Sequence, residues 1–224
     1  MAGGMGIRLR PFTYVQPKPL LPVANISPIE YLIRDMKRHG FDQILISVNY
    51  LSEKFDVCSR FEKKYGISVK LIRETKKMGT IGSLSLMRDF LDDPFILING
   101  DLFTEPPYKR MLKSYEAKGA SMVVGIKKHD YFSPYGVIAK NDDNTLIKIT
   151  EKPLRSDWIS AGVYLLDPKK IDLIKNTPMD IPIFIQNIQQ EGDIVITCDI
   201  GEKWLDIGNI EDFEKAESTI SDWK

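Results

Sequence analysis

The stretch MAGGMGIRLRPFTYVQPKPLLPV, residues 1–23, combines a cluster of glycines with cationic side chains at the start of the chain. Glycines allow backbone N–H groups to approach a ligand without a side chain in the way. Guanidinium and ammonium groups beside them favour an anionic ligand, and a polyphosphate is the first candidate. The residues concerned are Gly3, Gly4, Gly6, Arg8, Arg10 and Lys18.

Two common phosphate loops do not fit this stretch. A dinucleotide-binding fold needs G-x-G-x-x-G, but Leu9 stands where the third glycine belongs. A P-loop needs G-K-[ST] further on, and that motif is missing. A phosphate-binding glycine loop also normally follows a buried strand, whereas here it starts at residue 2. The sequence leaves open whether that strand is lacking or the chain was cut from a longer precursor.

Outward from this stretch, helix and strand patterns alternate through the first half of the chain. Ser27 and Pro28 form an N-cap and first helical position, and the apolar spacing after them predicts a helix that ends at Gly40. We expect strands at 43–48, 68–72 and 94–98, and helices at 52–65 and 80–91. Strands separated by such helices favour right-handed βαβ crossovers and a parallel sheet.

The second half contains more strand signals. A turn at residues 141–144 predicts a β-hairpin. We further expect strands at 121–127, 158–167 and around DIVITCDI, and helices near 107–118, from Pro168, near 181–190 and near 210–222. No linker, repeat or low-complexity tract interrupts the chain. The pattern predicts one α/β domain, residues 1–224, with a Rossmann-like, mostly parallel sheet flanked by helices and a small β-rich lobe.

Composition narrows the function classes. Thirty-one basic and thirty-one acidic residues leave no net charge to attract nucleic acid or an anionic membrane surface. Cys58 and Cys198 lie in apolar-leaning segments, as expected for reduced thiols in a cytoplasmic protein. No apolar run approaches the ~18 residues that cross a bilayer. We therefore expect a cytoplasmic protein that binds neither nucleic acid nor membrane.

The stretch AGGMGIRLRPFTYVQPKPLLPV resembles the opening motif of the sugar-1-phosphate nucleotidylyltransferases, A-G-G-x-G-T-R-L-x-P-L-T followed by P-K-P-L, and most resembles guanylyltransferase-like members for mannose or glucosamine 1-phosphate. The resemblance continues over essentially the whole chain, through GTIGSL (79–84), NGD (99–101), PYGVI (134–138), EKP (151–153), SAGVY (160–164) and WLDIGNIEDFEKA (204–216). The sequence departs from the family pattern at Ile7, where Thr is usual, and at Ser160, where Asn is common.

The resemblance implies the nucleotide-diphospho-sugar transferase fold and a Mg²⁺-dependent reaction. A sugar 1-phosphate would attack the α-phosphorus of a nucleoside triphosphate, and pyrophosphate would leave. By this similarity Arg8 and Lys18 have catalytic roles at the phosphates, and Asp101 and Asp206 bind the metal, since Mg²⁺ prefers carboxylates, water and phosphate oxygens. Asp101 could instead form a turn, and Asp206 could cap the next helix.

The same resemblance divides the chain into a nucleotide-binding half, about 1–105, and a sugar-phosphate-binding half, about 106–224. The expected nucleotide-binding residues are Ala2, Gly3, Gly4, Gly6, Glu74, Gly79 and Thr80. The expected sugar-phosphate-binding residues are Tyr135, Gly136, Glu151, Lys152, Ser160 and Gly162. A homodimer is a further expectation, and the sugar is left open.

The preferred base of the nucleoside triphosphate is predicted from Glu74. This residue stands where uridylyl- and thymidylyltransferases of the family tend to carry Gln. A carboxylate only accepts hydrogen bonds, and guanine offers it two adjacent donors, so GTP is favoured. Alternatively, Glu74 pairs with Arg73, Lys76 or Lys77 at the surface. The alternatives for function are a uridylyl- or thymidylyltransferase on a hexose 1-phosphate, a cytidylyltransferase on a non-sugar alcohol phosphate, and a catalytically silent regulatory paralogue.

Overall fold

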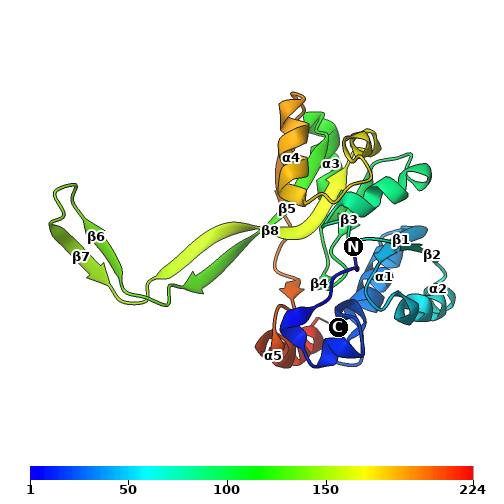
Figure 1. Ribbon diagram of the computed structural model, residues 1–224, viewed down its shortest axis with the longest axis horizontal. Coiled ribbons are helices and arrows are strands. Elements are labelled where there is room, and N and C mark those ends of the chain that lie inside the picture. Colours follow the sequence, from blue (N-terminus) through cyan, green and yellow to red (C-terminus); the bar gives the residue numbers. More distant parts are fainter. Residues whose placement is uncertain (224) are drawn as a thin grey trace.

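The computed structural model describes residues 1–223. It has an α/β body from which a long two-stranded arm projects (Figure 1). The helices are α1 (Pro28–Arg38), α2 (Cys58–Tyr65), α3 (Tyr108–Lys118), α4 (Ile181–Gln190) and α5 (Ile210–Ser221). The strands are β1 (Gln43–Val48), β2 (Ser68–Arg73), β3 (Phe95–Ile98), β4 (Leu102–Thr104), β5 (Met122–Phe132), β6 (Val137–Lys140), β7 (Leu146–Thr150), β8 (Leu154–Leu166), β9 (Val195–Asp199) and β10 (Trp204–Asp206). Within this part of the chain, no helix combines the length and apolar character of a membrane span.

The predicted α/β fold class is confirmed. β1 and β2 pair in parallel, as the helix between them led us to expect. A second sheet has the strand order β3-β8-β5-β9, in which β9 is parallel to β5. This sheet is mixed, because β8 is antiparallel to both of its neighbours.

Two short strands were not predicted, and they bring distant parts of the chain together. β4 and β10 pair antiparallel, and Asp206 lies opposite Leu102 in their register. Each strand has only three residues, which is too short for a recognisable alternation of apolar and polar positions. Their pairing therefore comes from tertiary contacts that the sequence pattern does not reveal.

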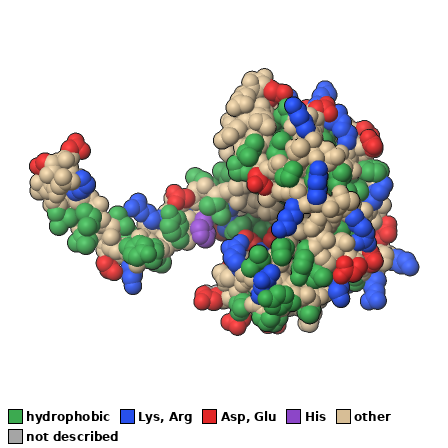
Figure 2. All heavy atoms as spheres, viewed as in Figure 1, with side chains coloured by type: hydrophobic (Ala, Val, Ile, Leu, Met, Phe, Trp, Pro, Cys, Tyr) green, Lys and Arg blue, Asp and Glu red, His purple; other side chains and the backbone are tan. Residues whose placement is uncertain are grey.

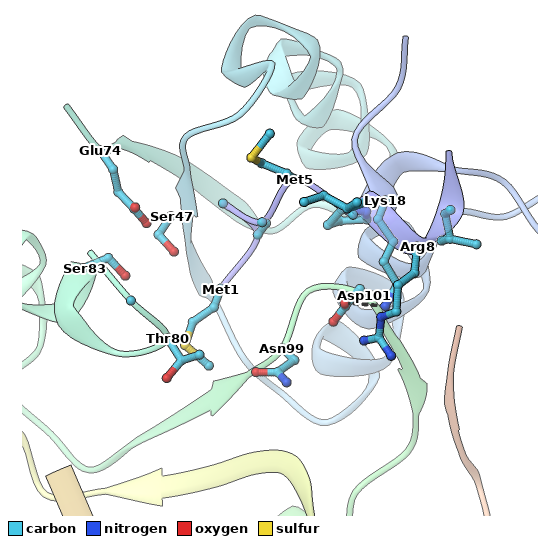
Figure 3. Close-up of a pocket in the computed structure, with 18 of the residues that line it drawn as sticks. Met1, Met5, Arg8, Lys18, Ser47, Glu74, Thr80, Ser83, Asn99 and Asp101 are labelled. Carbon is cyan, nitrogen blue, oxygen red and sulfur yellow. Dashed lines mark hydrogen bonds and ion pairs between the residues drawn. The ribbon is translucent and has the colours of Figure 1, made fainter. Parts of the chain in front are cut away.

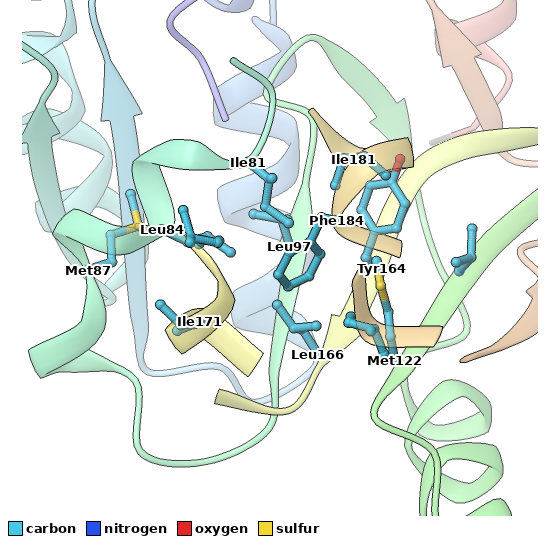
Figure 4. Close-up of a cluster of buried hydrophobic side chains, with 13 residues drawn as sticks. Ile81, Leu84, Met87, Leu97, Met122, Tyr164, Leu166, Ile171, Ile181 and Phe184 are labelled. Carbon is cyan, nitrogen blue, oxygen red and sulfur yellow. The ribbon is translucent and has the colours of Figure 1, made fainter. Parts of the chain in front are cut away.

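The core lies on both sides of the second sheet. Leu97, Tyr164 and Leu166 from β3 and β8 pack against Phe184 of α4, which is fully buried (Figure 4). A neighbouring cluster packs the other side of these strands against α1 and α3. Buried apolar surface of this kind is the main stabilising term of the fold, and it holds the carboxyl ends of the strands in place.

The helix predicted over 80–91 is wrong, because this segment forms two short 3₁₀ turns, Gly82–Leu86 and Arg88–Phe90. The backbone of this segment is hydrogen-bonded to the residues that precede α4: the Ile81 N–H donates to Met179 O at 3.0 Å. A Cβ at Gly82 would lie 2.7 Å from Thr177 O, so the two segments are in close contact. These contacts with residues 177–179 hold the segment in 3₁₀ turns, which are wound more tightly than an α-helix.

The arm is the β-rich lobe expected from the sequence, and it is longer than predicted. β5 and β8 are buried in the body and become exposed where they leave it, toward Phe132 and Leu154. The predicted hairpin, β6 paired with β7, forms the far end of the arm (Figure 1). β8 starts at Leu154 rather than at residue 158, because it pairs with the outer part of β5.

Candidate active site

A pocket of about 420 Å³ lies along the glycine loop (Figure 3). Its wall includes these residues predicted from the sequence: Ala2, Gly3, Gly4, Gly6, Arg8, Lys18, Glu74, Gly79, Thr80 and Asp101. The structure thus brings the expected nucleotide-binding residues and three of the four expected phosphate and metal residues to one place.

The loop starts between the carboxyl ends of two strands. The Ala2 N–H donates to Ser47 O of β1 at 3.0 Å, and the Gly100 N–H, just beyond β3, donates to Met1 O at 2.7 Å. In α/β folds, ligands bind where strands end in this way. The loop therefore lies at the position that the fold class predicts for a binding site.

Gly6 gives the loop its shape. Its φ of +57° is a left-handed conformation that side chains disfavour, and a Cβ there would lie 2.9 Å from Thr13 Cγ2. The Thr13 hydroxyl donates to Gly6 O at 2.9 Å, which ties the loop to the turn that leads to Lys18. The contact positions the loop backbone beside the Lys18 side chain.

Lys18 joins the two predicted metal ligands. Its ammonium nitrogen lies 2.6 Å from Asp101 Oδ2 and 2.9 Å from Asp206 Oδ1, and its side chain is only 11% exposed. Burial alone lowers the pKa of Lys18, but attraction to the two carboxylates outweighs it, and the pKa is raised. The lysine is therefore firmly cationic, and both carboxylates face one positive charge.

The register of β4 and β10 explains why these carboxylates meet. Asp101 immediately precedes Leu102, and Leu102 lies opposite Asp206. Asp206 is the last residue of β10 and does not cap α5, because Asn209 does so by accepting from the Asp212 N–H. The alternative role of Asp206 as a helix cap is therefore wrong.

The donor set at this point suits Mg²⁺. Two carboxylates already converge on one cation, and Mg²⁺ typically takes one or two carboxylates and completes its shell with water and phosphate oxygens. No group of three or more His, Cys, Asp or Glu suited to a metal occurs in residues 1–223. Residues 1–223 therefore offer no group of three or four side chains to an ion that needs that many protein ligands.

Arg8 lines the pocket from the 3₁₀ turn Ile7–Leu9. Figure 3 shows its side chain beside Lys18 and Asp101. Its guanidinium lies near Gly208: Nη1 is 3.8 Å from the position that a Cβ on Gly208 would occupy. The guanidinium forms no ion pair with the described residues. A guanidinium without an acidic partner at a pocket wall is available for a phosphate.

Glu74 follows β2 and enters the pocket next to the glycine loop. Its Oε1 lies 3.3 Å from where a Cβ at Gly3 would stand. Burial raises the pKa of Glu74, and hydrogen bonds from the Met78 backbone and Ser47 offset part of this effect. Within the described chain it has no ion pair, since Arg73 pairs with Asp56. The surface-pair alternative for Glu74 is therefore wrong.

Gly79 and Thr80 line the pocket and also hold the start of α4. Gly79 has φ +74°, and a Cβ there would lie 2.5 Å from Met179 O. Thr80 donates its N–H to Asp180 Oδ1 at 2.9 Å, and its hydroxyl accepts from the Ile181 N–H at 2.9 Å. The N–H and the hydroxyl of Thr80 thus both have partners within the protein.

The predicted sugar-phosphate residues on the arm lie away from this pocket. Tyr135 and Gly136 stand between β5 and β6, and Glu151 and Lys152 between β7 and β8 (Figure 1). Glu151 and Gly136 are neighbours, because Glu151 Oε2 lies 3.0 Å from where a Cβ at Gly136 would stand. The structure brings these four residues together, but not with the glycine loop.

Ser160 and Gly162 lie on β8, and neither lines the pocket. The Ser160 hydroxyl and the Tyr164 hydroxyl share a hydrogen bond of 2.8 Å. Gly162 makes room for Asn99, since a Cβ there would lie 2.6 Å from Asn99 Nδ2. The absence of a side chain at Gly162 therefore allows Asn99 to take its place in the pocket wall.

Sequence reasoning missed three polar residues of the pocket wall: Ser47, Ser83 and Asn99. Ser47 is in the carboxyl-terminal half of β1, and Asn99 directly follows β3. The rule that ligands bind at the carboxyl ends of strands could have identified both. Ser83 lies inside the motif GTIGSL (79–84), which could have identified it.

The nucleotidyl transferase family model matches residues 1–222. Mannose-1-phosphate guanyltransferases of Candida albicans and Saccharomyces cerevisiae are each 33% identical over 226 residues, which is 95% of this chain and 61% of the relative. The catalytic subunit beta of a mannose-1-phosphate guanylyltransferase from Dictyostelium discoideum is 31% identical with the same coverage. The chain thus spans about three fifths of the length of these relatives.

Solved structures share the fold. A putative glucose-1-phosphate thymidylyltransferase from Bacillus anthracis has a TM-score of 0.78 at 24% identity, over 99% of this chain and 93% of that one. HddC from Yersinia pseudotuberculosis has a TM-score of 0.75 at 23% identity, over 98% of this chain and 96% of that one. At these identities the likeness concerns the fold alone.

Proposed function

Because this chain belongs to the nucleotidyl transferase family, we propose that it transfers a nucleoside monophosphate from a nucleoside triphosphate, with GTP favoured, to a sugar 1-phosphate. The products are a nucleoside-diphosphate sugar and pyrophosphate. The names of the curated relatives, mannose-1-phosphate guanyltransferases, support this proposal. The observation that carries it is the pair Asp101 and Asp206 on the ammonium of Lys18, beside a glycine-lined pocket.

In the proposed reaction, an oxygen of the sugar phosphate attacks the α-phosphorus, and the bond from that phosphorus to the β-phosphate oxygen breaks. Both reactants are anions, so the protein must neutralise charge and hold them in line. The N–H groups of the loop and the unpaired guanidinium of Arg8 would bind the β- and γ-phosphates. They would then stabilise the charge that develops on the departing pyrophosphate.

We propose that Asp101 and Asp206 hold Mg²⁺. When bound there, the ion supplies positive charge to the reacting phosphates and helps to align them. Lys18 has a matching role: with Asp101 and Asp206 engaged in holding the ion, its ammonium group would be free to contact a substrate phosphate. The contacts of Lys18 with both proposed metal ligands support this role.

We propose that Glu74 selects the base. Its carboxylate lies in the pocket beside Gly3 and Ser47 and forms no ion pair with a Lys or Arg side chain of the described chain, although the Met1 ammonium acts on it through its charge. When ionised it accepts from both N1–H and N2–H₂ of guanine, whereas uracil and thymine would turn a carbonyl oxygen toward its charge. This arrangement favours GTP.

The sugar-phosphate half of the proposal rests on the arm. The second substrate would be bound by four residues of the arm: Tyr135, Gly136, Glu151 and Lys152. Lys152 would contact the phosphate of this substrate. This binding requires the arm to lie over a glycine-loop pocket. The arm exposes hydrophobic side chains along its length (Figure 2), with Phe132 70% exposed. Exposed apolar surface of this kind marks an interaction site. We propose that it is covered in a homodimer.

The proposed division of the chain agrees with this arrangement. Residues 1–105 supply most of the pocket wall and thus the nucleotide site. Residues 106–224 supply Asp206 and the arm.

A substrate matrix tests the proposed function. GTP, UTP, dTTP, CTP and ATP are each combined with several sugar 1-phosphates and with choline phosphate, and pyrophosphate release is measured in the presence of Mg²⁺. We expect the highest rate with GTP and a sugar 1-phosphate. Release only with CTP and choline phosphate, or none with any pair, would contradict the proposal.

A further inference from the structure

The strand that carries Asp206, β10, is short and only half-buried. Its three residues pair, within the described chain, with β4 alone. An isolated ladder of two strands is marginally stable. The register of this ladder matters, because a slip of one residue would turn Asp206 to the opposite face, away from Asp101 and Lys18. The convergence of the two carboxylates therefore depends on what holds β10 in this register.

An ion pair stands at the other end of the same ladder. Trp204 lies opposite Thr104, so the next residues along the two strands, Lys203 and Glu105, also lie opposite each other. The Glu105 N–H donates to Lys203 O at 3.2 Å, and the Lys203 ammonium nitrogen lies 2.9 Å from Glu105 Oε2. Opposite side chains of an antiparallel pair lie close enough to interact. A slip of β10 would separate these two charges, so the ion pair favours the observed register.

Glu105 also connects the ladder to α1. The hydroxyl of Tyr31, a helix residue that is almost fully buried, donates to Glu105 Oε1 at 2.7 Å. The Arg38 guanidinium of the same helix lies 3.8 Å from Oε2. Burial alone would raise the pKa of Glu105, but hydrogen bonds from Lys203 and Tyr31 outweigh it, and the pKa is lowered. The side chain is therefore an ionised carboxylate that links β10 to the buried face of α1.

We propose that Glu105 and Lys203 are positioning residues for Asp101 and Asp206, an inference that rests on the proposed role of these two carboxylates in holding Mg²⁺. Neither Glu105 nor Lys203 lines the nucleotide pocket, so they act on the site through the strands. Glu105 follows β4, which begins just after Asp101, and Lys203 precedes β10, which ends at Asp206. Without the ion pair, β10 is free to shift, and the two carboxylates no longer converge.

The test measures Mg²⁺ affinity by calorimetric titration of the full chain in the absence of substrates. Glu105→Gln and Lys203→Met each remove the ion pair, and we expect the Kd for Mg²⁺ to rise about tenfold or more, as is typical when a residue that supports a metal ligand is lost. Lys203→Arg keeps a cation opposite Glu105, so its Kd should stay close to that of the wild type.

Glu30 provides a matched control, because its surroundings repeat those of Glu105. Its Oε1 accepts from the Tyr65 hydroxyl and from the Lys64 ammonium, each at 2.8 Å. Its side chain is 13% exposed, compared with 15% for Glu105. Glu30 links α1 to α2, however, and does not contact the β4–β10 ladder through these bonds. Glu30→Gln should therefore lower Tm about as much as Glu105→Gln does, without changing Mg²⁺ affinity.

Wild-type Mg²⁺ affinity in Glu105→Gln and Lys203→Met would overturn the inference, because the ion pair would then stabilise the fold alone. An equal loss of affinity in Glu30→Gln would overturn it too, since the effect would then follow from general destabilisation. Should Glu105→Gln not fold, the comparison of Lys203→Met with Lys203→Arg decides in the same way. A wild-type chain that binds no Mg²⁺ would instead reject the metal assignment of the proposed function, and this inference with it.

Discussion

The Lys18 ammonium lies 2.6 Å from the carboxylate of Asp101, although the two residues are 83 positions apart in the chain. Asp206 reaches the same nitrogen from the other side, at 2.9 Å. A single lysine thus occupies the point where two carboxylates converge. In the proposed mechanism this arrangement links metal binding to the availability of a cation for the substrate, and it leads to the first two predictions.

Asp101→Asn and Asp206→Asn should each lower kcat by at least about a hundredfold, because a lost metal carboxylate removes several kcal/mol of charge stabilisation. Turnover is measured at saturating Mg²⁺, with circular dichroism to confirm the fold. Asp89→Asn, an exposed carboxylate away from the pocket wall, is the control and should keep full activity. Activity within a few-fold of wild type in either site variant would reject the metal assignment.

Lys18→Met should bind Mg²⁺ more tightly than wild type and yet lose turnover. Removing the ammonium ends its competition for the two carboxylates, and a gain of about tenfold corresponds to about 1.4 kcal/mol. Calorimetric titration with Mg²⁺ in the absence of substrates measures the change. Unchanged or weaker Mg²⁺ binding would show that the ion does not use the site that Lys18 occupies.

Lys152→Ala should raise KM for the sugar phosphate much more than KM for the triphosphate, because we place its cation on that substrate alone. Arg8→Ala should show the reverse, since Arg8 lines the pocket to which we assign the nucleotide. Steady-state kinetics with each substrate varied in turn separates the two. Equal effects of both variants on both substrates would refute the division into two phosphate sites.

Glu74→Gln should shift the preference from GTP toward UTP or dTTP by about tenfold or more, as expected when one charge-assisted contact of about 1.5–3 kcal/mol is exchanged. An amide offers both a donor and an acceptor to a pyrimidine. The ratio of kcat/KM values for GTP and UTP measures the shift. A wild-type enzyme that prefers UTP or dTTP would contradict the role of Glu74.

The GTP preference should depend on pH. Burial raises the pKa of Glu74 above its usual value of 4.5, so the carboxylate is protonated, and loses its acceptor role, at higher pH than an ordinary glutamate. The ratio of kcat/KM for GTP over UTP should therefore fall as pH is lowered toward the raised pKa of Glu74. Glu74→Gln has no such group, and its ratio should stay flat. A flat wild-type ratio would be inconsistent with this mechanism.

The sequence predicted the α/β class, most elements of the body and the glycine loop, because local patterns and motifs carry that information. It missed β4 and β10, whose three residues each are paired by tertiary contacts alone. It also predicted a helix at 80–91, where bonds to Met179 and Asp180 decide the backbone path. The projection of the arm, and with it the position of Lys152, depends on how far β5 and β8 stay paired, which alternation does not indicate.

Transfer of label from GTP is the most direct test of the central claim. The full chain is incubated with Mg²⁺, mannose 1-phosphate and GTP labelled at the α-phosphorus, and the products are separated. The account predicts that the label appears in a GDP-sugar while the pyrophosphate is unlabelled, and that Asp101→Asn abolishes this transfer. Label found only in free GMP or GDP, or remaining in GTP while CTP and choline phosphate react, would contradict it.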